Sequence, residues 1–149
     1  MDKNKATWIY VGLGILVLGG LFAYPRFKNS SPGSVSSDVP CLVPNVPLVQ
    51  HIHPHLTIIV DNTEETIPAN LGLGACEKAL HTHDATGQLH VEAQDSREYT
   101  LGDFFSVWGK SVLRDGYSLE VTSDDQPVQN PELLQLKDEQ HTMMKYTKL

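Results

Sequence analysis

Residues 51–92 read HIHPHLTIIVDNTEETIPANLGLGACEKALHTHDATGQLHVE, and this stretch decides the fold of the chain. It holds six of the seven histidines, in an H-x-H-x-H cluster followed by an H-x-H and an H-x-E pair. Imidazole is the commonest metal ligand and the usual proton shuttle near neutral pH. A hydrophobic core does not require so many histidines, so this stretch points to a function as well as to a fold.

The first half of the stretch predicts a strand and a tight turn. Apolar and β-branched residues alternate over residues 55–60, as expected for a strand with one face in a core. The dipeptide Asp61-Asn62 favours a turn, and residues 64–69 are expected to form the return strand.

The orientation of the first three histidines depends on where that strand begins. If the extended backbone starts at His51, then His51, His53 and His55 lie on the face opposite the core. Pro54 has no N–H to donate, so this end of the strand is expected at a sheet edge or outside the ladder.

The second half predicts a hairpin with a defined register. Residues 79–83 and 88–93 flank the turn Asp-Ala-Thr-Gly, so His81 is expected opposite His90. Directly opposed residues share a face of the sheet, with Cβ atoms about 4.5–5.5 Å apart. One face should therefore present His81, His83, His90 and Glu92. The core face should contain Leu80, Thr82, Leu89 and Val91.

The clustered histidines favour a transition-metal site. Neutral imidazoles with one carboxylate suit zinc or copper(II), whereas magnesium and calcium prefer oxygen ligands. The predicted ligands are His53, His55, His81, His83 and His90, with His51, Asp84 and Glu92 as secondary candidates. Solvated or hydrogen-bonded strand histidines are the simpler interpretation, but six of them in two clusters favour metal binding. His141, Met143 and Met144 are a further possibility as copper(I) ligands, although alternation in a last strand with one core methionine is favoured.

Two other functions remain open. The H-x-H and H-x-E spacing is similar to that of cupins, which would imply a metal-dependent enzyme with Asp84 or Glu92 as a base beside a metal-bound water. The glycine-framed cupin motif is absent and the domain is small, so binding without catalysis is favoured.

The second alternative is an accessory domain that binds a protein partner and senses pH through its histidines. An exposed surface over residues 104–108 would support it, although a core role for these aromatic residues is favoured.

The rest of the domain predicts one helix and further strands, hence an α+β fold. Thr100 is a suitable N-cap and Asp103 suits the third position of a helix that ends near Gly109. Strands are expected over residues 118–122 and 142–146. The ending, LKDEQ followed by a short strand, resembles that of ubiquitin-like β-grasp domains.

The segments HTHDATGQLHVE and REYTLGDFFSVWG resemble a pattern in uncharacterised membrane-anchored or exported proteins of bacteria and archaea. Its form is L-H-T-H-D-x-x-G-x-h-H-h-E, followed by T-L-G-x-F-F-x-x-W-G. The upstream H-x-H-x-H strand and the cysteine before the hairpin are also similar. The resemblance implies a common group formed by His51, His53, His55, His81, His83 and His90.

The N-terminal part predicts a membrane anchor and a tether. Residues 6–25 carry no charge and are long enough to cross a bilayer as one helix, with membrane lipid as its partner. A cleaved signal peptide is the alternative, but no convincing cleavage site follows.

Residues 29–50 are rich in proline and serine and predict a linker. It is expected to be flexible up to residue 40, with apolar residues that can pack from Cys41 onward. The domain proper is expected over residues 51–149.

Charge and cysteine content favour a location of this domain outside the cytoplasm. The net charge is −7, and residues 1–28 carry +3, so the remainder carries −10. An acidic domain without a basic patch argues against nucleic acid as a partner, and leaves a membrane or extracytoplasmic protein as the possible one. Cys41 and Cys76 are expected to form a disulfide in an oxidising compartment, with two unrelated thiols as the alternative.

Overall fold

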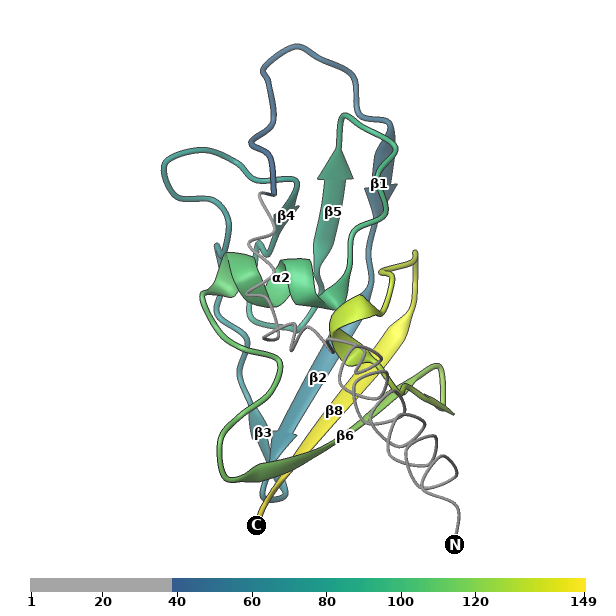
Figure 1. Ribbon diagram of the computed structural model, residues 1–149. Coiled ribbons are helices and arrows are strands. Elements are labelled where there is room, and N and C mark those ends of the chain that lie inside the picture. Colours follow the sequence, from purple (N-terminus) through teal and green to yellow (C-terminus); the bar gives the residue numbers. More distant parts are fainter. Residues whose placement is uncertain (1–38) are drawn as a thin grey trace, which may run out of the picture. The chain divides into compact units, whose positions relative to one another are not determined.

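The computed structural model describes residues 39–149 (Figure 1). The predicted membrane helix over residues 6–25 and the first part of the linker lie outside this range. Between residues 39 and 149, no helix is both long and apolar enough to span a bilayer. The described chain forms two β-sheets and one α-helix, which confirms the expected α+β class.

The larger sheet has five strands in the order β3-β2-β8-β6-β7. Its strands are β2 (His55–Val60), β3 (Thr63–Glu65), β6 (Tyr117–Ser123), β7 (Gln126–Pro127) and β8 (His141–Lys148). β2 and β8 run parallel to each other, and the other neighbours are antiparallel. Figure 1 shows β2, β8 and β6 side by side in blue, yellow and green.

Two tight turns close hairpins of this sheet. Asp61 and Asn62 have φ values of 48° and 67° between β2 and β3, and Asp124 and Asp125 have φ values of 48° and 62° between β6 and β7. Asp and Asn tolerate this left-handed backbone better than most residues, and the turn at Asp61-Asn62 forms where the sequence predicts it.

The return strand is shorter than the predicted range of 64–69. β3 ends at Glu65, and the chain then leaves the sheet to bury Ile67, which is 3% exposed. Pro68 has no N–H for a ladder bond, so the strand would end before it in any case.

The smaller sheet has the order β1-β5-β4, with β1 (Gln50–Ile52), β5 (His90–Ala93) and β4 (Leu80–His81). His81 lies opposite His90, which confirms the predicted register. The predicted core face is also confirmed, because the side chains that it comprises are all buried: Leu80, Thr82, Leu89 and Val91.

The first histidine cluster is divided between the two sheets. β1 ends at Ile52 and pairs with β5, whereas β2 begins at His55 and pairs with β8. Pro54 lies at the break and cannot donate to either ladder. The strand therefore does not continue from His51 to His55, and the expected common face of the three histidines does not form.

Helix α2 (Leu101–Trp108) begins and ends at the predicted residues. The side chain of Thr100 accepts a hydrogen bond from the N–H of Asp103, and the Asp103 carboxylate accepts one from the N–H of Thr100. This reciprocal pair is a capping box. Phe104 and Phe105 are buried in the core, and Trp108 is partly buried against it. Figure 1 shows α2 at a level between the two sheets. A 3₁₀ turn, η1 (Pro131–Leu133), precedes β8.

The part of the linker that the structure describes packs onto the domain. Val39 is 1% exposed, and the N–H of Leu42 donates to the carbonyl of Glu77 over 2.7 Å. A disulfide joins Cys41 to Cys76, with the two Cα atoms 5.8 Å apart. The predicted pairing is confirmed, and so is the packing of the chain from Cys41 onward.

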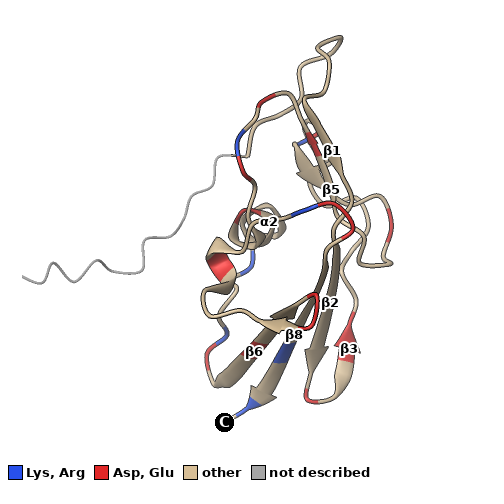
Figure 2. Cartoon of the chain, turned by 90° about the vertical axis from the view of Figure 1, so that its right-hand side faces the viewer, with Lys and Arg blue, Asp and Glu red and all other residues tan. Residues whose placement is uncertain are grey.

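The described part of the chain contains more acidic than basic residues, in line with the negative net charge of the sequence. Residues 39–149 contain sixteen Asp or Glu and seven Lys or Arg, and Figure 2 shows acidic positions in red at several turns and on β3. Lys110 and Arg114 both donate to Glu65 over 2.6 Å. Partial burial raises the pKa of Glu65, but the bonds from Arg114 and Lys110 outweigh this effect and hold it below its usual value.

Candidate metal centre

The smaller sheet brings five histidines and one glutamate together. Its register places His51 opposite Glu92 and His81 opposite His90. Residues two apart on a strand share a face, so His90 and Glu92 of β5 lie on the same side. His53 and His83 follow β1 and β4 at a spacing of two residues. The sequence motifs thus converge because β5 is the central strand.

Four of these residues form what we call the inner group: His81, His83, His90 and Glu92. Each offers one donor atom, and the four atoms lie within 4.8 Å of one another. The Nε2 atoms of His81 and His83 are 3.2 Å apart, and Glu92 Oε1 is 3.5 Å from His90 Nδ1. Donors around a tetrahedral zinc ion with bonds of about 2.0–2.1 Å lie roughly 3.4 Å apart. The inner group therefore has the spacing and the donor types of a transition-metal site.

His81 is fixed in the orientation that a ligand needs. Its side chain is fully buried, and its Nδ1 lies 2.9 Å from the carbonyl oxygen of Lys78. Because a carbonyl only accepts, Nδ1 must carry a proton, so in the neutral ring the lone pair is on Nε2. Nε2 faces His83 Nε2 at 3.2 Å and Glu92 Oε1 at 3.9 Å. Metal-binding histidines are held in the same manner by a hydrogen bond to the second ring nitrogen.

His90 supplies an unsatisfied atom at the centre of the cluster. Its Nδ1 is buried and has no hydrogen-bond partner among residues 39–149. Such atoms are rare in folded proteins, since nearly all buried polar groups are paired. Burial lowers the pKa of His90, and His83, His53 and His81 lower it further, against the opposing effect of Glu92. The imidazole is therefore neutral near pH 7, which is the form that binds a metal ion.

The outer group consists of His51, His53 and His90, whose donor atoms also lie within 4.8 Å of one another. The ring centroids of His53 and His90 are 4.7 Å apart. His51 Nε2 lies 3.3 Å from Glu92 Oε1, and its side chain is 53% exposed. The outer group thus shares His90 with the inner group and lies closer to solvent.

Two predicted ligands lie in neither group. Asp84 Oδ1 accepts hydrogen bonds from the N–H and hydroxyl of Thr86, over 2.9 and 2.6 Å, and so closes the hairpin turn. The hydroxyl bond and then the N–H bond lower the pKa of Asp84 below its usual value. His55 lies in β2 beside His141 of β8, with ring centroids 5.6 Å apart.

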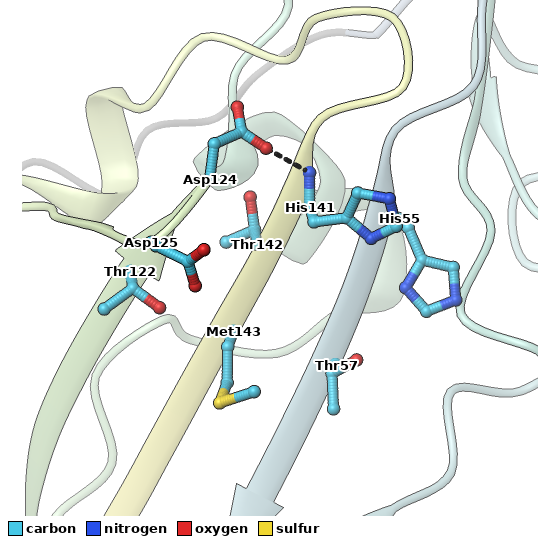
Figure 3. A pocket seen from close by; sticks show the side chains of 8 residues that line it. All are labelled: His55, Thr57, Thr122, Asp124, Asp125, His141, Thr142 and Met143. Carbon is cyan, nitrogen blue, oxygen red and sulfur yellow. Dashed lines mark hydrogen bonds between the residues drawn. The ribbon is translucent and has the colours of Figure 1, made fainter.

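His55 and His141 line an open cleft on the larger sheet with a volume of about 450 Å³. Figure 3 shows the two rings next to each other, and the N–H of His141 donating to Asp124. The other lining residues are Thr57, Thr122, Asp125, Thr142 and Met143. Met143 is 47% exposed and Met144 is fully buried, which confirms that one methionine of this strand belongs to the core.

Glu77 is a neighbour of the cluster that the sequence pattern did not indicate. Its Oε1 lies 3.9 Å from His81 Nε2, and the side chain is 49% exposed. Glu77 directly follows Cys76, and its carbonyl accepts from Leu42. Its position follows from the loop and the disulfide rather than from strand periodicity, so the adjacent cysteine was the only available signal.

No protein-family model matches this chain, and no match was found among curated proteins or solved structures. The function of this domain is therefore inferred from the geometry of the histidine cluster. Together the fold and the cluster define a small α+β domain with histidine and glutamate groups that could hold a metal ion.

Proposed function

We propose that this protein is a membrane-tethered, extracytoplasmic domain that binds a transition metal ion, copper or zinc, through the inner group. The proposal rests on the convergence of three imidazoles and one carboxylate, whose donor atoms lie within 4.8 Å of one another. One of these rings, His90, has a buried Nδ1 without a hydrogen-bond partner in the described part of the chain. An ion at this point would satisfy that nitrogen and would bind the Nε2 lone pair of His81 in place of its hydrogen bond with His83 Nε2.

Metal binding accounts for the cluster better than pH sensing for a protein partner. Exposed aromatic residues on α2 would have supported the partner hypothesis, but Phe104 and Phe105 are 0% and 1% exposed and Trp108 is partly buried against the core. Solvated strand histidines would not require the full burial of His81 or its bond to the Lys78 carbonyl.

The donor types favour zinc or copper(II). Imidazole suits both ions, and the inner group contains no thiolate or thioether that would select copper(I). Four protein donors complete a tetrahedral shell, which is typical of structural or storage sites rather than catalytic ones. Binding without catalysis is therefore our first candidate.

A metal-dependent enzyme is the second candidate, and the position of Glu92 favours it. Glu92 Oε1 is closer to His51 Nε2, at 3.3 Å, than to His81 Nε2, at 3.9 Å. If Glu92 stays with His51, three histidines would hold the ion, and a water would occupy the fourth position with Glu92 as its base.

The cellular location is part of the same proposal. The disulfide between Cys41 and Cys76 suits an oxidising compartment. The uncharged segment over residues 6–25 would anchor the domain in the membrane. We further propose that the larger sheet and α2 are β-grasp-like, since the first and last strands of this sheet are its parallel central pair and α2 connects its two hairpins.

The test is the metal affinity of the full-length protein, purified in detergent without a histidine tag and stripped with a chelator. Zinc and copper(II) are titrated in competition with a chromophoric chelator. The double variant His81→Ala, His83→Ala should lose affinity by on the order of a hundred-fold or more. His141→Ala, a histidine outside both groups, is the matched control. Equal affinity of the double variant and the wild type would refute the proposal.

A further inference from the structure

We propose that the cluster is a two-ion centre, in which the inner group holds one ion and His51 and His53 hold a second, with the Glu92 carboxylate between them. This inference rests on the proposed function. It adds a stoichiometry, an order of loading and a bridging residue.

The number of donors exceeds the needs of one ion. A tetrahedral zinc ion takes four protein donors, and five imidazoles and one carboxylate meet here. The structure separates these donors into two groups, each within 4.8 Å, that have only His90 in common. One shell of four would leave two of these six donors without a role.

Glu92 is the residue that can serve both ions. A neutral imidazole has a single lone pair, so His90 can bind one ion only, whereas a carboxylate has two oxygens. Glu92 Oε1 lies 3.3 Å from His51 Nε2, 3.5 Å from His90 Nδ1 and 3.9 Å from His81 Nε2. Its side chain is 18% exposed, so this anion is largely shielded from water between the two groups.

The charge of the cluster also depends on Glu92. Two divalent cations among neutral imidazoles repel each other, and an anionic bridge reduces this repulsion. Metal ions in two-metal sites typically lie about 3.5–4 Å apart, a separation that one carboxylate can span. Glu77, 3.9 Å from His81 Nε2, is a second anion beside the inner ion.

The two positions should fill in order. The inner position has His81 fully buried and oriented by the Lys78 carbonyl. The outer position depends on His51, whose side chain is 53% exposed and must be ordered on binding. The inner ion should therefore bind first and more tightly, and the outer ion should exchange with solvent.

The experiment counts zinc ions on the full-length, untagged protein by native mass spectrometry during a titration. The wild type and His141→Ala should bind two ions in separate steps. His51→Ala with His53→Ala should bind one ion and keep the tight step. His81→Ala with His83→Ala should lose the tight step and weaken first-ion affinity by on the order of a hundred-fold or more.

Copper(II) provides an independent readout of the distance between the ions. With one equivalent, electron paramagnetic resonance should show an isolated ion, and with the second equivalent the signal should broaden or lose intensity through coupling. Glu92→Gln should reduce this coupling while both outer histidines remain.

Three results would overturn the two-ion centre. The first is a wild type that saturates with one ion. The second is a second ion that survives His51→Ala with His53→Ala but is lost in His141→Ala, which would place it in the cleft of the larger sheet. The third is two ions without magnetic coupling. A wild type that binds no ion would refute the proposed function itself.

Discussion

His90 is shared by both donor groups, and a protonated His90 ring cannot bind the inner ion. Its Nδ1 is buried and unpaired, and burial together with three neighbouring imidazoles lowers the pKa of the ring. The unfolded chain exposes the same ring to water, where its pKa is close to the ordinary value of 6.5. The folded state therefore binds fewer protons than the unfolded state in the range between the two pKa values.

The metal-free protein should consequently lose stability as the pH falls below about 6.5 and through the folded pKa of His90. Above 6.5 the ring is neutral in both states, so the contribution of His90 is then fully present. Nuclear magnetic resonance of the chelator-treated protein should show the His90 ring titrating with a midpoint below 6.5. In His90→Gln, the melting temperature should change less with pH in this range than in the wild type. A His90 midpoint at or above 6.5 would contradict the lowered pKa.

The sequence predicts the inner group because a hairpin register is local information. The turn between His83 and Gln88 places His81 opposite His90 without reference to distant residues. Local information could not predict that His53 joins the histidine cluster and that His55 does not. Pro54 ends one ladder, and whether the chain then joins the same sheet or another depends on strands far away in the sequence.

Helix α2 is the element whose bounds the sequence predicts best, since its start and end are encoded by caps. Thr100 and Asp103 form the capping box, and Gly109 ends the helix with φ at 72°. The left-handed backbone at Gly109 favours glycine.

Thr100→Ala should lower the free energy of unfolding by about 1 kcal/mol, because the N–H of Asp103 loses its acceptor. The melting temperature should fall by a few degrees, measured by circular dichroism. Thr100→Ser retains the hydroxyl and should behave like the wild type. If the serine variant is destabilised as much as the alanine variant, the cap does not stabilise the helix.

The parallel pair β2 and β8 is an element-scale feature that the sequence did not indicate. It pairs His55 with His141, which lies far along the sequence. The local pattern of apolar residues does not indicate which distant strand is the parallel partner. The same pairing creates the cleft and removes His55 from the histidine cluster. The prediction for His55 therefore differed from the structure because strand order is not local information.

At the scale of the whole molecule, the domain begins earlier than its histidines. β1 starts at Gln50, and the N–H of Val49 donates to the carbonyl of Ala93 over 2.7 Å. The sequence predicted that this segment packs from Cys41 onward, but not its partner β5, which lies about forty residues later in the chain. The α+β class was predictable from composition and pattern, but the division into two sheets was not.

The disulfide should contribute about 3–4 kcal/mol to the stability of this domain, as expected for a loop of 35 residues. It also holds the loop that contains Glu77 and Lys78 next to His81. Cys41→Ser with Cys76→Ser should therefore lower both the free energy of unfolding and the zinc affinity. Chemical denaturation and zinc titration measure the two effects. A reducing agent should lower the stability of the wild type and leave that of the double variant unchanged. Equal denaturation midpoints for the two proteins would contradict this role.

The most direct test of the central claim is the position of a bound zinc ion, found by anomalous X-ray scattering at the zinc edge from zinc-loaded crystals. We predict a strong peak about 2.0–2.1 Å from His81 Nε2 and from His90 Nδ1, with His83 and Glu92 completing the shell. Zinc that is found only elsewhere, for example between His55 and His141, or a cluster that stays free of zinc at saturating concentration, would contradict the assignment.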